Sequence, residues 1–370
     1  LACHEAHVAL SMARSRTVFL LLGSLTWSIR SWVDIFAVRQ WPGNVVDLDF
    51  RLVVKEADAF LLCARHVQEV VDMSSEDINA LQVPEVATRI CAFFRLWCVV
   101  ELAAAQLFEK PVVMLIGCAS EEDRHEDRAV FKPNQDMINQ LWQLLDVRKA
   151  VASVEADRVR ELAIVEAREG GADAVNSLGR GALNGASVCM DRPDILRAAV
   201  GDLKPLRALS SKQEREAAMI LAAAAGYEVA VLVMVEMGAR VEAKIETGMW
   251  TGTTALMMAA YGGHTRILKA LITSRGADVQ VKSKYGETAL MKAVQGQHLP
   301  AVKVLLDEGA DVQAKRYDGA TALMFGDSYM PVLEALLTKG ADVQAKDDEG
   351  KTTADQHSDD LAKHLLSSWV

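Results

Sequence analysis

The sequence lacks the features that define several common classes of protein. No two of its six cysteines are closer than seven positions, so the Cys-x-x-Cys spacing of zinc and redox sites does not occur. It has no block of lysines and arginines, and its formal net charge is −10. We therefore do not expect nucleic acid or an anionic membrane surface to be the main partner.

Long apolar runs are missing too. No segment reaches the roughly 18 to 20 consecutive apolar residues that a membrane-spanning helix requires. Arg14 and Arg16 precede the apolar residues 18–25 and imitate a signal peptide, but no small-x-small cleavage site follows. The cysteines lie mostly in apolar runs, as reduced buried thiols do, which favours a cytoplasmic location. Because the first residue is Leu1, the chain is open to interpretation as a fragment.

Metal-ligating patterns are also absent. Three histidines have no second histidine or carboxylate at metal-ligand spacing: His66, His264 and His298. We expect no metal site and no resident cofactor.

The sequence does contain an internal repeat. The tetrapeptide Thr-Ala-Leu-Met begins at Thr254, Thr288 and Thr321, so its copies start 34 and 33 residues apart. Each copy is followed about twenty residues later by Gly-Ala-Asp-Val-Gln. Fixed periods in this range are typical of solenoids, whose small units stack because none can bury its apolar face alone. The last third of the chain is therefore predicted to be a solenoid.

The order of residues within each unit resembles the ankyrin repeat. A glycine before the Thr-rich start, a Thr-x-Leu element, a Gly-His pair or its equivalent, a leucine-rich run and Gly-Ala-Asp-Val follow one another. The resemblance implies a polar hairpin and two helices in each unit, and an array that binds protein. We expect four all-α units, the first at 216–244, with a degenerate half-repeat at 195–203 before them and a cap at 351–370 after them.

Several departures from the repeat pattern carry structural expectations. The first hairpin has about four extra residues near 247–250 and should protrude. The fourth unit is two residues shorter than the third, so its first helix, around 325–328, should be shortened or distorted. Met257 and its equivalents replace the histidine that ordinarily ties one hairpin to the next. We therefore expect more loosely joined units, with thioether packing in place of polar ties.

The resemblance also predicts where a partner protein binds. Ankyrin fingertips and first helices face the concave side of the array, and exposed aromatic and arginine residues are the usual anchors of binding. The alternative is that a tip aromatic packs on the next finger. The candidate residues are Met249, Trp250, Lys284, Tyr285, Arg316 and Tyr317.

The N-terminal region has a different pattern. Apolar runs at 32–38, 59–64 and 112–117 are separated by stretches with helical character, and a further helix is expected at 136–145. Strands that are apolar on both faces and alternate with helices indicate a parallel α/β sheet. In the expected helix 96–108, Glu101 is the only charge. Such a carboxylate must find a cation, face a wet cleft or take up a proton.

Four motifs in this region resemble the order of motifs in TIR domains. They are Trp-Val-Asp-Ile at Trp32, Lys-Glu-Ala-Asp-Ala-Phe at Lys55, Trp-Cys-Val-Val-Glu ending at Glu101, and Lys-Pro-Val-Val at Lys110. Segment 32–38 also resembles heterokaryon-incompatibility domains. The resemblance implies a flavodoxin-like parallel sheet and association with other TIR domains. Only 18–22 could form the first strand of that sheet, and almost no residues remain for the first helix before Trp32, so we expect the domain to be truncated.

Two roles are open for Glu101. In enzymatic TIR domains the glutamate after Trp-Cys cleaves NAD at the nicotinamide-ribose bond, and the resemblance implies that role for Glu101. A carboxylate can stabilise the oxocarbenium-like transition state of that reaction. The other interpretation is that Glu101 pairs with an arginine such as Arg95 or Arg51.

We therefore expect an α/β domain followed by an ankyrin array. The expected organisation is an irregular or truncated segment at 1–29, a TIR-like domain at 30–150, a helical and Gly-rich connector at 151–190 with flexible glycines, and the array with its caps at 191–370. The predicted function is a protein-interaction and signalling scaffold, in which the array binds a partner and the TIR-like domain self-associates. The alternative is an NAD glycohydrolase that the array regulates or targets, with NAD as its substrate.

Overall fold

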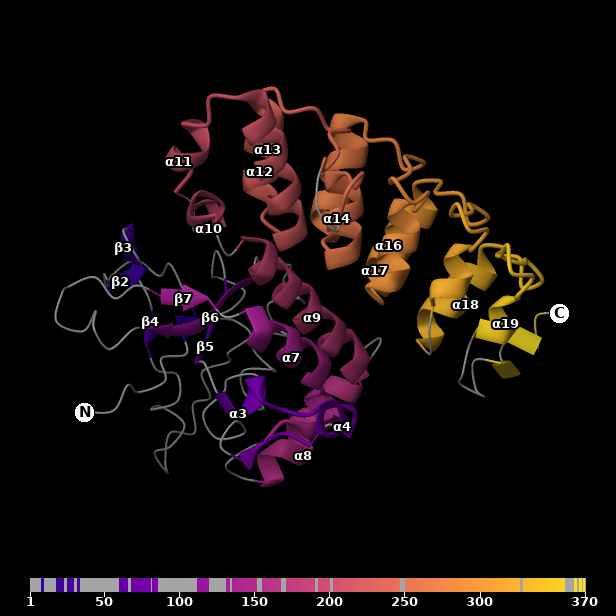
Figure 1. The fold of residues 1–370 in the computed structure, drawn as a ribbon, viewed down its shortest axis with the longest axis horizontal. Helices are drawn as coiled ribbons and strands as arrows, with labels where there is room; N and C mark the ends of the chain where they lie inside the picture. Colours follow the sequence, from indigo (N-terminus) through magenta and orange to yellow (C-terminus); the bar gives the residue numbers. More distant parts are fainter. Residues whose placement is uncertain are drawn as a thin grey trace. The chain divides into compact units, whose positions relative to one another are not determined.

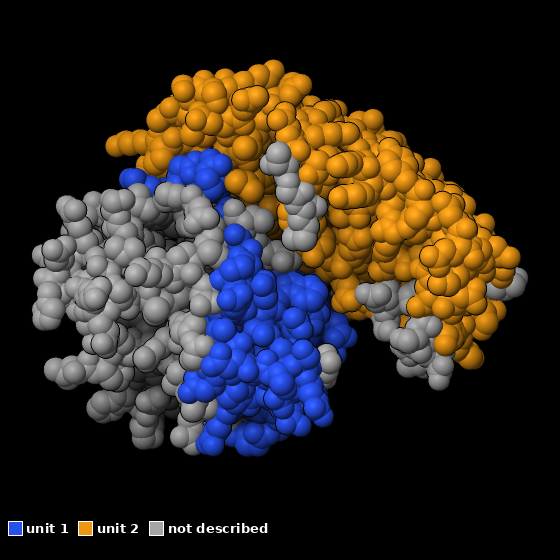
Figure 2. Space-filling model, viewed as in Figure 1, with its two compact units in different colours: residues 1–201 blue, residues 202–370 orange. Residues whose placement is uncertain are grey.

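The computed structural model divides the chain into two compact units, residues 1–201 (unit 1) and 202–370 (unit 2), which Figure 2 shows in different colours. Each unit is described by itself. The residues that the structure describes are 8–9, 18–22, 25–29, 32–33, 60–65, 68–80, 82–85, 112–119, 131–133, 135–151, 155–167, 171–189, 192–199, 202–246, 250–326, 329–356, 363–364, 366–367 and 369.

Unit 1 contains a five-stranded mixed sheet (Figure 1). Its order is β4 (Trp32–Val33), β1 (Val8–Ala9), β5 (Phe60–Arg65), β6 (Val112–Ala119) and β7 (Phe131–Pro133). β5 and β6 pair in parallel, with Phe60 opposite Val112 and Arg65 opposite Gly117. The apolar runs at 59–64 and 112–117 are thus confirmed as strands. The other described pairs in this sheet are antiparallel, so the described strands do not support a wholly parallel, TIR-like sheet.

Residues 18–22 do not belong to that sheet. They form β2 (Val18–Leu22), which pairs with β3 (Leu25–Ile29) in a separate antiparallel hairpin. Only Gly23 and Ser24 separate the two strands in the sequence, and a two-residue link beginning with glycine favours such a local pairing. The expectation that 18–22 forms the first strand of a parallel sheet is therefore wrong. The expected helices 47–57 and 96–108 lie outside the described residues.

Helices make up the rest of the described part of unit 1. They are α3 (Gln68–Val71), α4 (Ser75–Asn79), α7 (Gln135–Leu144), η3 (Val147–Lys149), α8 (Glu155–Glu166), α9 (Gly171–Cys189) and α10 (Pro193–Ala199). The helix expected at 136–145 is confirmed as α7. The longest helix, α9, contacts β6, α7 and α8.

Helix α9 overturns the expectation that the glycines near 170–185 form a flexible connection. Gly171 has a positive φ of 51° at the start of the helix. Gly179, Gly181 and Gly185 lie within α9 and are buried. A glycine in a buried helical position leaves room for a neighbouring element to approach closely. Helix α9 is 19 residues long and packs against β6, α7 and α8, so these glycines belong to a packed helix and not to a flexible connection.

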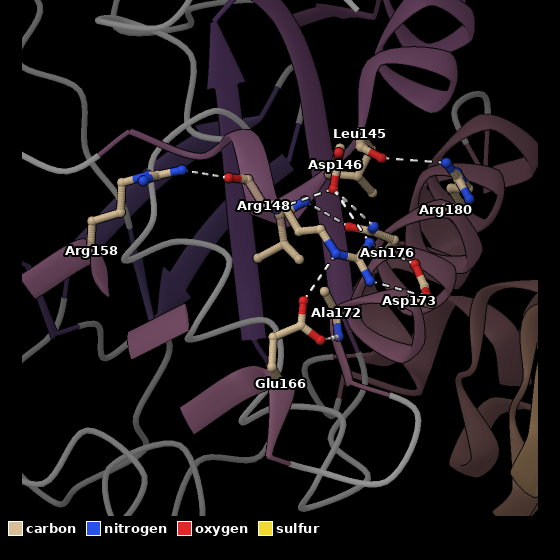
Figure 3. A network of polar contacts seen from close by, with 10 residues as sticks. Leu145, Asp146, Arg148, Arg158, Glu166, Ala172, Asp173, Asn176 and Arg180 are labelled. Atoms are coloured by element: carbon tan, nitrogen blue, oxygen red, sulfur yellow. Dashed lines mark hydrogen bonds and ion pairs between the residues drawn. The ribbon is translucent and has the colours of Figure 1, made fainter. Parts of the chain in front are cut away.

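Arg148 holds the beginning of α9 to α8 and η3 (Figure 3). Its two terminal nitrogens donate to both carboxylate oxygens of Asp173, at 2.7 and 3.1 Å, and its Nε donates to Glu166 at 2.9 Å. The other oxygen of Glu166 accepts the backbone N–H of Ala172, an otherwise unpaired group at the start of the helix. The hydrogen bond with Asp173 is the main reason that the pKa of Arg148 is raised. Valines and alanines form an apolar cluster beside this network.

Arg180 and Arg158 donate hydrogen bonds to backbone carbonyls in the same region. Arg180 donates to the carbonyls of Trp142 and Leu145 at the end of α7, at 3.2 and 3.3 Å, and lies 5.3 Å from the centre of the Trp142 ring. Arg158 donates to the carbonyls of Ala150 and Arg148. Since these contacts satisfy carbonyls that the ends of α7 and η3 leave open, we interpret them as structural.

Unit 2 is a solenoid of paired helices, as the repeat predicts (Figure 1). The first helices, α12, α14, α16 and η5, contact one another in sequence, and a second helix follows each of them. After α11 (Lys204–Arg207) the pairs are α12 (Lys212–Ala225) with α13 (Glu228–Glu236), α14 (Ala255–Gly262) with α15 (Thr265–Lys269) and its π-helical continuation η4 (Ala270–Ser274), α16 (Ala289–Gln295) with α17 (Leu299–Asp307), and η5 (Ala322–Phe325) with α18 (Met330–Thr338). We call these pairs repeats one to four. Helix α19 (Thr353–Gln356) follows them.

The fourth repeat confirms the expected distortion. In repeats two and three, the side chains of Thr254 and Thr288 accept the backbone N–H three residues later, at 3.4 Å, and so cap α14 and α16. Thr321 makes no such bond, and η5 is a 3-10 turn of four residues. A tighter turn absorbs the two missing residues because each 3-10 residue rises further along the axis than an α-helical one.

Polar ties join the repeats even though the expected histidines are missing. Gln280 donates to the carbonyl of Gly309, and Gln313 to that of Gly340, at 2.8 and 2.7 Å. His264 reaches the carbonyl of Ala224 at 3.1 Å. The array thus keeps polar contacts between units that the expectation of thioether packing alone did not include.

Candidate protein-binding surface

Two of the predicted binding residues lie exposed at neighbouring hairpin tips. The side chains of Tyr285 and Tyr317 are 52% and 70% exposed. The N–H of Tyr317 donates to the carbonyl of Tyr285 at 3.2 Å, so the two tips are joined through their backbones. Gly286 has a φ of 83°, and a Cβ there would lie 2.8 Å from the Tyr317 nitrogen, so only glycine fits. Lys284, beside Tyr285, is also exposed.

Arg316 is held within its own hairpin. Its Nε donates to Asp318 at 2.7 Å, and its Nη2 pairs with the second oxygen of that carboxylate. The guanidinium also lies 5.0 Å from the centre of the Phe325 ring. The hydrogen bond from Arg316 is the main reason that the pKa of Asp318 is lowered to about 2. Arg316 thus keeps its orientation through a carboxylate on one side and a ring on another.

Trp250 packs on its neighbours. Its ring lies 5.1 Å from that of Tyr261 on α14, at an interplanar angle of 56°. The Nζ of Lys292 on α16 lies 5.4 Å from the centre of the Trp250 ring, within the range of a cation–π contact. Trp250 thus contacts the first helices of repeats two and three, whereas the alternative expected a tip aromatic to pack on the next finger. Met249 lies outside the described residues.

Lys292 also belongs to a buried ion pair that sequence reasoning missed. Its Nζ lies 2.7 Å from Glu287, and the two side chains are only 7% and 9% exposed. Glu287 also accepts from Ser283 and Gln295, and Lys292 donates to Gln295 at 3.2 Å. Buried charges require this kind of pairing. The sequence does contain a signal for this pair. At these two positions the third repeat has charged residues, whereas the neighbouring repeats have uncharged ones.

These residues form one candidate surface, which we call the fingertip surface. Its members come from hairpin tips and first helices, and they combine exposed tyrosines with a buttressed tryptophan and paired charges. Its exposed and half-buried members are Trp250, Tyr261, Lys284, Tyr285, Gln295, Arg316, Tyr317 and Phe325. The buried pair of Glu287 and Lys292 supports it through the contact of Lys292 with Trp250.

Two histidines connect repeats near this surface, His298, which is buried, and His264, which is half-buried. Burial lowers the pKa of His298 to about 3 and that of His264 to about 4, so both rings are neutral at neutral pH. His298 makes a hydrogen bond with the backbone of Tyr261, and His264 with that of Ala224. Within the described part of the chain, no group of three or more histidines, cysteines or carboxylates is placed to hold a metal ion.

The candidate catalytic residue, Glu101, lies outside the described residues, as do Arg51 and Arg95. The described residues therefore do not test the NAD-cleaving site, which stays a prediction. Of the helices whose residues are described, none combines the length and the apolar character needed to cross a membrane.

Comparison with known proteins identifies the repeats. A family model described as ankyrin repeats (3 copies) matches residues 167–283 and 256–347. Over 72 residues, 20% of this chain, the sequence is 40% identical to the ankyrin repeat and KH domain-containing protein mask of Drosophila melanogaster and to the human ankyrin repeat and KH domain-containing protein 1.

A third relative, ankyrin repeat domain-containing protein 29 of Danio rerio, is 39% identical over 62 residues, 17% of this chain. The matched stretches cover 2%, 3% and 21% of the lengths of these three relatives. The family-model match begins before α9 in unit 1 and continues through the paired helices and hairpins of unit 2. The C-terminal region of the chain is therefore an array of ankyrin repeats.

Proposed function

We propose that the ankyrin array binds a partner protein through the fingertip surface. The observation that carries this proposal is the pair of tyrosines, 52% and 70% exposed, held at successive hairpin tips. Tyrosine, tryptophan and arginine dominate the binding energy of protein interfaces. A tyrosine has few side-chain torsions to immobilise, so it presents a large contact area at low entropic cost.

The neighbouring residues support the same role. Trp250 and Arg316 are braced by Lys292 and Asp318, so they need little reorganisation when a partner binds. Rigid anchors lose less free energy on association than mobile ones do. We assign contact with the partner to Met249, Trp250, Lys284, Tyr285, Arg316 and Tyr317, with the tyrosines as the main anchors.

For the N-terminal region we keep the sequence-based proposals of a TIR-like domain at 30–150 that self-associates, and of the connector at 151–190. A signalling scaffold in the cytoplasm would combine these parts. Cys189 is buried, and burial raises the pKa of its thiol to about 12. A buried thiol is the ordinary state of cysteine in a reducing compartment. NAD cleavage by Glu101 stays a prediction from the sequence, and in our proposal no resident cofactor is needed.

Photo-cross-linking tests the binding surface and identifies the partner in one experiment. A benzoylphenylalanine placed at Tyr285 or Tyr317 should cross-link to one predominant protein, which mass spectrometry identifies. The control position is Val229 on α13, which is 54% exposed. A second copy of this chain would appear as a cross-linked dimer.

The affinity of the purified partner then provides the quantitative test. We expect Tyr285→Ala and Tyr317→Ala each to weaken binding by about fivefold or more, and Val229→Ala to leave it unchanged. Equal cross-linking from position 229, or an unchanged affinity of the double tyrosine variant, would show that the partner binds elsewhere.

A further inference from the structure

Four lysines occupy the same position in successive hairpins of unit 2. Lys282, Lys315 and Lys346 each stand four residues before the glycine of their hairpin, at Gly286, Gly319 and Gly350. Lys244 stands eight residues before Gly252, because its hairpin contains the four-residue insertion. All four lysines are exposed. We call Lys244, Lys282, Lys315 and Lys346 the lysine row.

Hydrogen bonds hold three of the four side chains of this row. The Nζ of Lys244 donates to the backbone carbonyl of Lys282 at 2.8 Å. In the same way, the Nζ of Lys282 donates to the carbonyl of Lys315 at 2.9 Å, and the Nζ of Lys315 donates to the carbonyl of Lys346 at 3.1 Å. Each contact uses one of the three donors of an ammonium group. The row therefore holds its charges at the spacing of the repeats and keeps donors for a ligand.

The row also differs from four other lysines of unit 2. Lys212, Lys292, Lys339 and Lys351 form ion pairs with carboxylates. Among the described residues, no member of the lysine row has a carboxylate within 4.0 Å of its ammonium group.

Lys346 is influenced by one carboxylate at longer range. The pKa of Asp355 is lowered mainly by hydrogen bonds from Thr352, and Lys346 makes a smaller contribution.

We propose that the lysine row binds an extended acidic segment of a polypeptide, with a carboxylate at about every third residue. Packed helices lie roughly 8 to 10 Å apart, and that distance sets the spacing of equivalent residues in adjacent repeats. A polyproline II segment has three residues per turn and rises 3.1 Å per residue, so every third side chain points the same way about 9 Å further along. The carboxylates of such a segment match the row one to one.

Nucleic acid fits the row less well. Duplex DNA carries one charge for about every 1.7 Å of its axis, much denser than one cation in each repeat. The row is one lysine wide, and the net charge of −10 would repel a long polyanion. This inference goes beyond the fingertip surface, since it needs neither the tyrosines nor the partner that they bind.

A synthetic peptide with four Glu-Pro-Pro triplets tests the proposal directly. It favours the polyproline II conformation and places a carboxylate at every third residue. The control peptide has the same composition, with its four glutamates adjacent at one end. Fluorescence anisotropy with the full chain at low salt should show that the triplet peptide binds at least threefold more tightly, and that binding weakens as salt is added.

The variant K244Q/K282Q/K315Q/K346Q should weaken binding of the triplet peptide about tenfold or more, since four exposed ion pairs are lost. The matched control K212Q/K269Q/K303Q/K339Q removes the same charge from lysines outside the row and should change the affinity less than twofold. Circular dichroism melting of both variants shows whether the array stays folded, and a row variant with arginine at all four positions should restore binding.

Three results would overturn the proposal. One is equal weakening by the two glutamine variants, which would indicate general charge attraction. Another is equal binding of the two peptides, which would exclude recognition of the spacing. The third is tighter binding of a single-stranded oligonucleotide of equal charge than of the triplet peptide. If the peptides do not bind at all, the row is not an acidic-segment site, whatever the tyrosine variants show.

Discussion

Repeats three and four have the same order of elements, but they differ in which positions carry polar residues. After the hairpin glycine, repeat three has Glu287 and Lys292 as a buried ion pair. Repeat four has Ala320 and Phe325 at the same two positions, in a small apolar cluster. The stability of a repeat array is a sum of unit terms and nearest-neighbour terms, so such a difference acts locally. The comparison shows that one scaffold position can carry either an ion pair or apolar packing.

The two repeats also differ in how their helices begin. Thr288 caps α16 with its side chain, whereas Thr321 leaves its hydroxyl buried without a hydrogen-bond partner. The second helix starts after His298 in repeat three and after Tyr329 in repeat four. The second pair of positions, His298 and Tyr329, provides a substitution that turns one repeat into the other.

The ion pair should give the largest effect. Glu287→Ala leaves the Lys292 ammonium buried without its carboxylate, and we expect the free energy of unfolding to fall by about 3 to 5 kcal/mol. Urea unfolding followed by circular dichroism measures this loss. The lost carboxylate also lies beside the lysine that contacts Trp250, so the tryptophan fluorescence should change.

The double variant Glu287→Ala/Lys292→Phe sharpens the comparison, because it gives repeat three the residues of repeat four. Replacing both members of a buried pair by apolar groups is often neutral or stabilising. We expect the double variant to be more stable than the single one. If the double variant loses as much stability as the single one, the pair is not the reason for the loss.

Acid should destabilise repeat three through His298, to which repeat four has no equivalent histidine. In the unfolded chain the pKa of histidine is about 6.5, whereas burial lowers the pKa of His298 to about 3. Above pH 6.5 the ring is neutral in both states and contributes no pH dependence. As the pH falls from 6.5 towards 3, the unfolded state binds a proton that the folded state excludes, so stability is lost. At pH 5 the loss is about 2 kcal/mol.

Urea unfolding at pH 7 and pH 5 measures this dependence. His298→Tyr, which copies the residue of repeat four, should remove a large part of the loss, and His264 should account for a further part because its pKa is also lowered by burial, to about 4. His364, which is exposed, is the control, and His364→Gln should keep the full pH dependence. An unchanged dependence in the His298 variant would mean that other groups cause it.

The features that depend on sequence spacing were the ones that could be predicted. The period of the Thr-Ala-Leu-Met phrase predicted the solenoid, and the two missing residues predicted the distorted η5, because both follow from chain length alone. The exposed tips at Tyr285 and Tyr317 followed from the repeat pattern. The contacts of Trp250 did not, since they depend on which side chain of the next repeat lies beneath the ring.

The N-terminal unit shows why apolar runs are a weaker signal. They identified β5 and β6 but not the direction of the other strands, because an apolar run has no feature that distinguishes parallel from antiparallel pairing. The glycines of α9 led to the wrong prediction of a flexible connection for a related reason. Glycine favours a loop by its own propensity, and burial against neighbouring elements overrode that preference.

The threonine caps should give the smallest effect and the clearest contrast between the two repeats. Thr288→Val removes the side-chain oxygen that accepts the Met291 N–H, and we expect a loss of about 1 kcal/mol. Thr321→Val removes a buried hydroxyl that has no hydrogen-bond partner, so the same change should be neutral or stabilising. Urea unfolding of both variants, with Thr254→Val as a second capped position, gives the three values. Equal losses at Thr288 and Thr321 would mean that the shortened repeat keeps a cap in solution, and the difference between repeats three and four would then lie in the ion pair and the histidine alone.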